Sequence, residues 1–169
     1  IIDPCDALDI EQATEAIADY NGPVYMRLLR GKVPVVLDEY DYTFQIGKAR
    51  LLREGEDVLF ISSGLMTMRA LEAAKALEAD RIGCAVLHVP TIKPLDTETI
   101  LAAARRPGRL MIVTENHTII GGLGEGVAAL LMREGVAPVF RQIALPDEFL
   151  DAGALPTLHD RYGISTSEL

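Results

Sequence analysis

The 169-residue chain has no tryptophan, only two cysteines and few aromatic residues, at 5%. Two cysteines are too few for a disulfide framework, and a structural zinc site usually needs about four Cys or His ligands at close spacing. We therefore expect Cys5 and Cys84 to be plain thiols, with Cys84 buried inside the apolar run 83–87. The scarcity of aromatic rings favours a core of Leu, Val, Ile and Ala, as in helices packed on a sheet.

Clustered positive charge and long apolar runs are also missing. The net charge is −9, and no block of Lys or Arg is present. Nucleic-acid binding is therefore not expected, because phosphates are neutralised by grouped cations. No apolar run approaches the roughly 20 residues that span a bilayer, and Ile1 opens no basic leader. These absences predict a cytoplasmic protein with no membrane and no nucleic-acid partner.

The chain also lacks an initiator methionine, and it opens on what the pattern indicates is the edge of a strand. We interpret it as a piece of a longer polypeptide; removal of the true start by processing is the alternative. Helical spacing of apolar residues predicts a helix over 7–20, which Asn21-Gly22-Pro23 ends, and a strand over 24–29. Residues 31–42 are expected to form a connecting arm rather than a packed element.

From Phe44 onward the pattern becomes a series of strand–helix repeats. Apolar strands that alternate with helices predict an α/β fold, with an open, mostly parallel sheet covered by helices on both faces. The expected strands are 46–52, 57–62, 83–89, 109–114 and 138–143, and the expected helices are 66–79, 97–105 and 124–133.

A glycine-rich loop, Gly121-Gly122-Leu123-Gly124, follows one of these strands and opens a helix. Exposed backbone N–H groups at a helix start can hold a phosphate. The loop does not match a dinucleotide fingerprint, because the sixth position counted from Gly122 is Val127 rather than glycine. We favour a tight turn in which the helix comes close to the sheet, with a phosphate loop as the alternative.

Glu115 and His117 leave the carboxyl edge of the same strand. Ligand sites of open α/β sheets lie outside the carboxyl ends of strands, and this pair could serve as acid and base. We favour a hydrogen-bonded pair that fixes the loop at a domain or subunit contact. His88 and His159 have no partner at ligand or triad spacing and are expected to be structural, with their hydrogen bonds satisfied.

Arg27 and Arg30 remain as candidates for anion binding. Arg30 follows the expected strand and stands beside Gly31, where a guanidinium can bind an anion such as a sugar phosphate through two hydrogen bonds. Taken alone, the residues indicate a soluble acidic α/β domain without a self-contained active site.

Several stretches together resemble the transketolase family. The segments 2–7 and 22–27 resemble the end of the family's middle, pyrimidine-binding domain, and 55–64, 91–96 and 115–124 resemble its C-terminal domain. The resemblance implies that residues 1–31 end the middle domain, 32–43 form a linker and 44–169 form the C-terminal domain. It also aligns Arg30 with an arginine that contacts the substrate phosphate.

The resemblance further implies transfer of two-carbon ketol units between sugar phosphates by a complete enzyme that uses thiamine diphosphate and Mg²⁺. The cofactor site and the catalytic residues belong to other parts of such an enzyme, so we expect no cofactor, no metal and no catalytic residue in this chain. Its expected roles are subunit packing and closure of one side of the substrate channel. Its expected partners are an N-terminal thiamine-diphosphate-binding half or subunit, a second copy in a homo-oligomer, and the sugar phosphate.

Two alternatives stay open at this point. Deoxyxylulose-phosphate synthase and the beta subunit of 2-oxo acid dehydrogenases carry similar C-terminal domains. The order Arg27-Leu28-Leu29-Arg30-Gly31 resembles the synthase branch, although Leu28-Leu29 replaces the Tyr-Pro of that branch. The alternative of another class is a non-catalytic interaction module.

Overall fold

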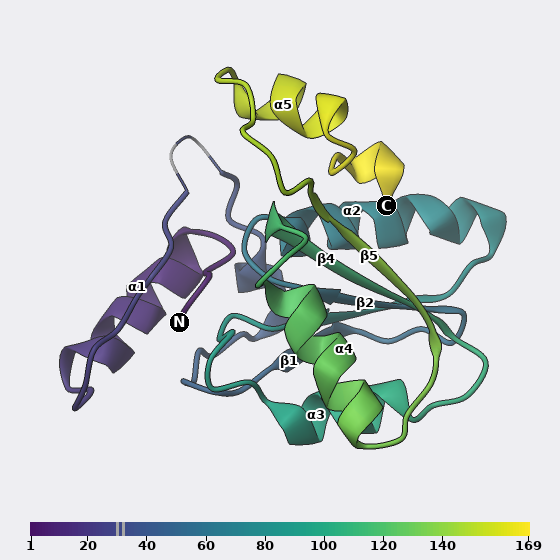
Figure 1. The fold of residues 1–169 in the computed structure, drawn as a ribbon, viewed down its shortest axis with the longest axis horizontal. Helices are drawn as coiled ribbons and strands as arrows, with labels where there is room; N and C mark the ends of the chain where they lie inside the picture. The colour runs from purple at the N-terminus through teal and green to yellow at the C-terminus, as the bar shows by residue number, and fades with distance from the viewer. Residues whose placement is uncertain (30, 32) are drawn as a thin grey trace.

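The computed structural model describes residues 1–29, 31 and 33–169. Its centre is a five-stranded sheet with the strand order β1-β3-β2-β4-β5 (Figure 1). Strands β2 (Val58–Ser62), β3 (Cys84–His88), β4 (Leu110–Thr118) and β5 (Val139–Leu145) run parallel, and β1 (Arg50–Arg53) pairs antiparallel with β3. The predicted open, mostly parallel sheet is confirmed.

Helices cover both faces of this sheet. Helix α2 (Met66–Leu77) packs on one face, and helices α3 (Thr97–Ala104) and α4 (Leu123–Arg133) pack on the other. Successive strand residues point to opposite faces, so Phe60 enters the core under α2 while Leu59 enters the core under α3 and α4. Burial on both faces explains why the central strands are apolar without alternation.

Two strands differ most from the sequence-based expectation. The first strand covers only Arg50–Arg53, not 46–52, because Gly47 has a left-handed φ of +76° and the Ala49 N–H is bound by the Asp96 carboxylate. Strand β4 continues four residues past its expected end at 114, and its last residue, Thr118, pairs with Leu145 of β5.

The described residues among the first 44 form a smaller layer beside the sheet. Helix α1 (Ala7–Ala18) begins after Asp6, whose carboxylate accepts the Asp9 N–H at 3.1 Å. Among the described residues, the expected strand over 24–29 pairs through a single parallel bridge, between Ile2 and Met26. This layer has its own buried apolar cluster, made by Ile2, Cys5, Ala13, Leu37, Tyr42 and Phe44.

The expectation that 31–42 would form an arm without packing is wrong for part of the segment. Leu37 is fully buried at the start of a short 3-10 helix, Leu37–Tyr40, and Tyr42 is 6% exposed. The carboxylate of Asp6 accepts the backbone N–H groups of Val36 at 2.8 Å and Leu37 at 2.9 Å. A side chain 30 positions away therefore fixes this segment, which local periodicity does not reveal.

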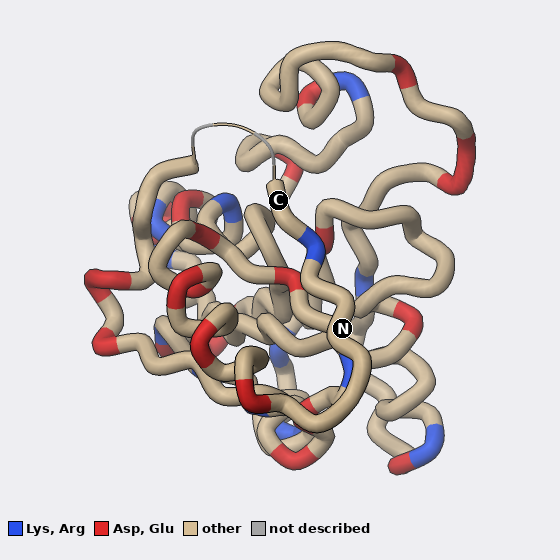
Figure 2. The backbone as a smooth tube through the Cα atoms, turned by 90° about the vertical axis from the view of Figure 1, so that its left-hand side faces the viewer, with Lys and Arg blue, Asp and Glu red and all other residues tan. Residues whose placement is uncertain are grey.

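The chain ends in helix α5 (Leu155–Arg161) and a 3-10 turn, Thr166–Glu168, which lie above α2 in Figure 1. Asp and Glu are distributed along the backbone with Lys and Arg interspersed among them (Figure 2). In the part of the chain that the structure describes, no helix combines the length and apolar character needed to cross a membrane.

Candidate functional site

The carboxyl ends of β2 and β4 form the place where an open α/β sheet ordinarily receives a ligand. These two strands are neighbours, but the connections that follow them lead to opposite sides of the sheet, which opens a crevice between them. Ser63 follows β2, and its backbone N–H lies 3.4 Å from the carbonyl oxygen of Thr114 in β4.

The chain's own N-terminal segment fills this crevice. The Asp3 carboxylate accepts the Ser63 hydroxyl at 2.7 Å, and the Gly64 N–H donates to the Asp3 carbonyl at 3.0 Å. Arg27 pairs with the same carboxylate, with its Nε 3.0 Å from Asp3 Oδ1. Gly64 has a φ of +55°, and a Cβ there would lie 2.7 Å from both carboxylate oxygens. Glycine therefore lets Asp3 enter the position that a ligand would otherwise take.

A second carboxylate fills the start of α4. Glu115 is 2% exposed, and its two oxygens accept the backbone N–H groups of Leu123 at 2.7 Å and Gly124 at 2.8 Å. These N–H groups have no partner within the helix and attract an anion. Because Glu115 supplies that anion, the loop has no free N–H pair here for a phosphate.

Each glycine of this loop is required for a different physical reason. A Cβ on Gly122 would overlap the Glu115 carboxylate, and a Cβ on Gly124 would overlap the Gln142 side chain from β5. Gly121 has open space around it but a left-handed φ of +80°. The start of α4 thus comes close to individual side chains of β4 and β5, whereas the sequence predicted a close approach to the sheet in general.

His117 lies two residues after Glu115 and is partly buried. Its Nδ1 is 3.1 Å from the carbonyl oxygen of Thr118. Within the described residues no hydrogen bond joins Glu115 to His117; each of them binds main-chain groups instead.

A hollow of about 130 Å³ brings most of the predicted site residues together. Drug-sized ligands occupy pockets of roughly 300–1,000 Å³, so this hollow is too small for a ligand as large as thiamine diphosphate. Gly124 is not among the residues that line it, and Arg30 lies outside the described residues. Asp3 was not expected here from the sequence. The lining includes Asp3, Tyr25, Arg27, Glu115, His117, Gly121 and Gly122.

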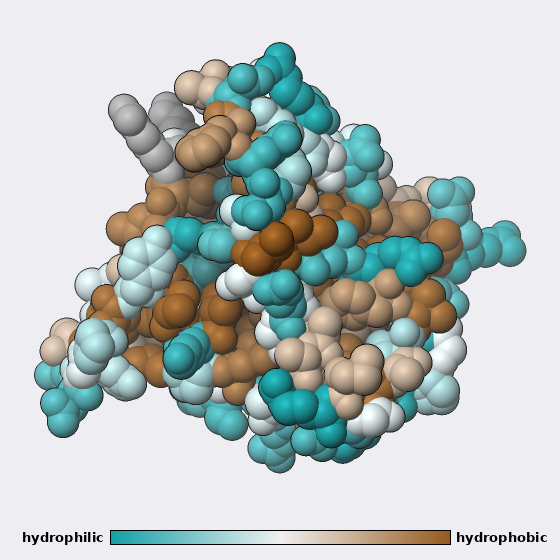
Figure 3. Space-filling model, viewed as in Figure 1, coloured by the Kyte–Doolittle hydropathy of each residue, from teal (hydrophilic) through white to brown (hydrophobic). Residues whose placement is uncertain are grey.

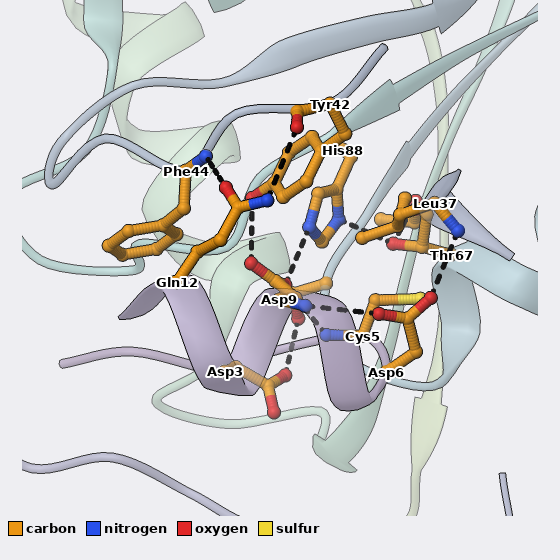
Figure 4. A network of polar contacts seen from close by, with 12 residues as sticks. Asp3, Cys5, Asp6, Asp9, Gln12, Leu37, Tyr42, Phe44, Thr67 and His88 are labelled. Carbon is orange, nitrogen blue, oxygen red and sulfur yellow. Dashed lines mark hydrogen bonds and ion pairs between the residues drawn. The ribbon is translucent and has the colours of Figure 1, made fainter. Parts of the chain in front are cut away.

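A buried polar network joins the N-terminal layer to the α/β domain (Figure 4). Asp9 of α1 accepts the Tyr42 hydroxyl at 2.7 Å and the Cys5 N–H at 2.8 Å, and its Oδ2 lies 3.0 Å from His88 Nε2. The other ring nitrogen of His88 is 2.8 Å from the Thr67 hydroxyl. Asp9, His88 and Thr67 are fully buried, so the network has no access to a substrate.

The hydrogen bonds of His88 agree with the structural role expected for it. For His159, only one of the two ring nitrogens has a partner among the described residues. His159 Nδ1 is 2.8 Å from Arg69 Nη2, but its buried Nε2 has no partner among the described residues. Burial, and then the charge of Arg69, lower the pKa of His159 and favour its neutral ring.

Burial also raises the pKa of several other titratable groups, and nearby carboxylates add to the effect. Burial, and then the charges of Asp6 and Asp9, raise the pKa of the Cys5 thiol. Burial and the charge of Asp9 raise the pKa of Tyr42, which stays a hydrogen-bond donor. Cys84 is buried as expected, and burial raises its pKa as well. Over residues 1–29, 31 and 33–169, no group of three His, Cys, Asp or Glu residues could hold a metal ion.

Known proteins provide an independent comparison. Residues 47–169 match the family model described as the transketolase C-terminal domain. Over 170 residues the chain is 69% identical to y4mN, an uncharacterized transketolase family protein of Sinorhizobium fredii, with 100% of the chain and 49% of that protein covered. It is 39% identical over 167 residues to 1-deoxy-D-xylulose-5-phosphate synthase of Heliobacterium modesticaldum, with 98% of the chain and 26% of the synthase covered.

Among solved structures, the chain is similar to a split-gene transketolase described as an inactive β4 tetramer. The TM-score is 0.90 at 36% sequence identity, and the match covers 99% of this chain and 54% of that chain. The chain therefore spans about half the length of y4mN and of this structure, and about a quarter of the synthase.

Proposed function

Since the chain belongs to the transketolase family, we propose that it is the C-terminal section of an enzyme that transfers two-carbon ketol units between sugar phosphates. Residues 1–31 then end a middle domain, 32–43 link the two domains, and 44–169 form the C-terminal domain. The observation that carries the proposal is the match to the C-terminal-domain model over 47–169 together with the 0.90 TM-score.

The filled crevice favours a structural rather than a catalytic role for this section. Asp3 occupies the crevice between β2 and β4, and Glu115 occupies the start of α4. Both anion-accepting places at the carboxyl edge are thus used by carboxylates of the chain itself. We propose that this edge packs against the rest of the enzyme and closes one side of its substrate channel.

In the complete enzyme, thiamine diphosphate with Mg²⁺ would supply the carbon–carbon bond chemistry. The described residues at the carboxyl edge of the sheet do not fit this cofactor. The helix start that could accept a diphosphate is filled by Glu115, and the adjoining hollow of about 130 Å³ is too small. We therefore assign the cofactor to an N-terminal half or subunit and assign this chain no step of the reaction.

Arg30 is the residue that we propose touches substrate, through its guanidinium and the phosphate of the sugar. Arg27, three residues earlier, is not available for this role because it pairs with Asp3. His117 and the loop Gly121–Gly124 are proposed to contact the other half. The complete enzyme is proposed to be a cytoplasmic homo-oligomer.

A second candidate is the synthase reaction, which the 39% identity to 1-deoxy-D-xylulose-5-phosphate synthase and the order Arg27 to Gly31 favour. The complete protein, including the polypeptide encoded before Ile1, separates the two. Supplied with pentose phosphates, a transketolase forms sugars that are longer and shorter by two carbons. Product that appears only when pyruvate is the donor assigns the synthase branch. Turnover of neither substrate contradicts both.

A further inference from the structure

Helix α5 is short, and one buried side chain anchors it beside α2 (Figure 1). The helix has seven residues, and a helix of this length is not stable in water without tertiary contacts. His159 is the only buried residue of α5, at 1% exposed. The position of α5 therefore depends strongly on what His159 contacts.

One guanidinium of α2 meets both His159 and the turn that follows α5. Arg69 Nη2 lies 2.8 Å from His159 Nδ1, and Arg69 Nη1 lies 3.5 Å from the Thr166 hydroxyl oxygen. The Thr166 hydroxyl donates to the Glu72 carboxylate, also on α2, at 2.7 Å. Of these contacts, the one between Arg69 and His159 reaches α5 itself.

Only one protonation state of His159 is compatible with this contact. A guanidinium donates hydrogen bonds and cannot accept them, so Arg69 is the donor and His159 Nδ1 is the acceptor. An imidazole nitrogen accepts only when it carries no hydrogen, so the ring is neutral with its hydrogen on Nε2. A protonated ring would carry hydrogen on both nitrogens and would place a second positive charge against Arg69. Protonation thus replaces a hydrogen bond with a repulsion.

The groups around the ring do not compensate for an added positive charge. The buried Nε2 has no partner among the described residues, and within that part of the chain no carboxylate is ion-paired with His159. Burial, and then the charge of Arg69, lower the pKa of His159 below its usual 6.5, and Asp160 opposes this effect in part. The remaining charged groups here have other partners: Glu72 binds Thr166, and Arg161 pairs with Asp151.

We propose that the contact between Arg69 and His159 is a pH-sensitive latch, which holds α5 on α2 while His159 is neutral and releases it when His159 is protonated. Leu155 and Pro156 of α5 form one wall of a hollow of about 320 Å³, and Met68 of α2 lies on another. Hydrophobic surface, brown in Figure 3, lies below α5 in this view. Release of α5 therefore opens the hollow. The latch does not depend on the proposed function.

The direction of the pH dependence follows from the two states of the latch. In the released state His159 is hydrated and titrates near its usual 6.5, whereas in the latched state its pKa is lower. Above 6.5 the ring is neutral in both states and the latch is fully present. Between 6.5 and the lowered pKa, the ratio of latched to released molecules falls by up to about tenfold per pH unit.

Peptide-resolved hydrogen exchange on the complete protein tests the latch, at about pH 7.5 and about pH 5.5. After correction for the intrinsic pH dependence of exchange, peptides covering 155–164 are expected to lose about three- to tenfold in protection at the lower pH. Peptides from α3 are expected to keep theirs.

His159→Asn is the matched variant. Its side-chain oxygen is as many bonds from the main chain as Nδ1 is, and it accepts from Arg69 without titrating. Protection over 155–164 is expected to be the same at both pH values in this variant. His117→Asn is the control, because His117 Nδ1 faces the Thr118 carbonyl oxygen instead of a guanidinium. It is expected to keep the pH dependence of the parent.

Equal protection of 155–164 at both pH values in the parent overturns the proposal. An equal loss in the parent and in His159→Asn also overturns it, because another group is then responsible. If His159→Asn does not fold, nitrogen-15 labelling of the parent's histidine rings decides. The latch predicts hydrogen on His159 Nε2 and none on Nδ1 at about pH 7.5, whereas hydrogen on Nδ1 rejects it.

Discussion

Gly122 is the position where a single methyl group has the clearest predicted effect. A Cβ there overlaps the Glu115 carboxylate, which must then move away from the N–H groups of Leu123 and Gly124. Gly122→Ala is expected to lower the free energy of unfolding by about 1–3 kcal/mol. For a chain of this length, each kcal/mol corresponds to roughly 2–4 °C in a thermal melt.

Gly126→Ala is the matched control in the same helix. The nearest atom to its added Cβ is 4.0 Å away, on Leu95, and the position needs no left-handed φ. This variant is expected to melt at the parent temperature or slightly above it, because alanine is favoured over glycine inside a helix by about 0.5–1 kcal/mol. Equal melting temperatures for the two variants contradict the role given to Gly122.

Arg30→Ala tests the proposed phosphate contact in the complete protein. A charge-assisted hydrogen bond to phosphate contributes about 1.5–3 kcal/mol, so KM for phosphorylated substrates is expected to rise about ten- to a hundredfold. KM for unphosphorylated sugars is expected to stay constant. A KM for phosphorylated substrates that does not change rejects the assignment.

Arg27→Ala, which breaks the pair with Asp3, is expected to lower stability instead.

Helix α3 begins at a cap that also fastens the segment before β1. The Asp96 carboxylate accepts the N–H groups of Thr99 at 3.2 Å and Ala49 at 2.9 Å, and the Thr99 hydroxyl at 2.8 Å. Burial alone would raise the pKa of Asp96, but these hydrogen bonds outweigh it and lower the pKa below its usual 3.8. The ionised carboxylate is therefore more stable in the folded chain than in the unfolded one.

Asp96→Ala is expected to reduce the free energy of unfolding by about 1–2 kcal/mol near neutral pH. The deficit should persist above 3.8 and vanish as the pH falls through the lowered pKa of Asp96, where the parent loses the same contribution. Urea unfolding of both proteins across this range measures it. Asp19→Ala, at the exposed end of α1, serves as control. A deficit of equal size at all pH values rules out this account.

Asp9 of helix α1 makes a buried polar contact with the α/β domain, through His88. Removing its carboxylate leaves the Cys5 N–H, the Tyr42 hydroxyl and His88 Nε2 without their acceptor in a buried site. Asp9→Ala is expected to destabilise the chain by about 3–5 kcal/mol, measured by urea unfolding. Glu11→Ala, on the exposed side of the same helix, should cost little. Similar losses in both variants would show that the network does not hold α1.

The elements themselves follow from local pattern, but the contacts between them do not. Apolar strands alternating with helices predicted the sheet, its mostly parallel direction and the helices on both faces. Asp9 and His88 are 79 positions apart, and no periodicity links them. Glu115 was noticed for its place after a strand, yet its capping of α4 depends on how the chain turns back at Gly121. An acidic residue at the end of an apolar run, a few residues before a glycine loop, was the available signal.

At the scale of the whole molecule, the carboxyl edge of the sheet is occupied by the chain's own carboxylates. Asp3 and Glu115 fill its two anion-accepting places, and the hollow between them has about 130 Å³.

The central claim is that this section belongs to a thiamine-diphosphate enzyme without holding the cofactor. Calorimetric titration of thiamine diphosphate with Mg²⁺ tests it most directly, on the chain 1–169 and on the complete protein in parallel. The account predicts saturable 1:1 binding to the complete protein and no specific heat with the chain alone. A micromolar 1:1 complex with the chain alone, or no binding to the complete protein, would contradict it.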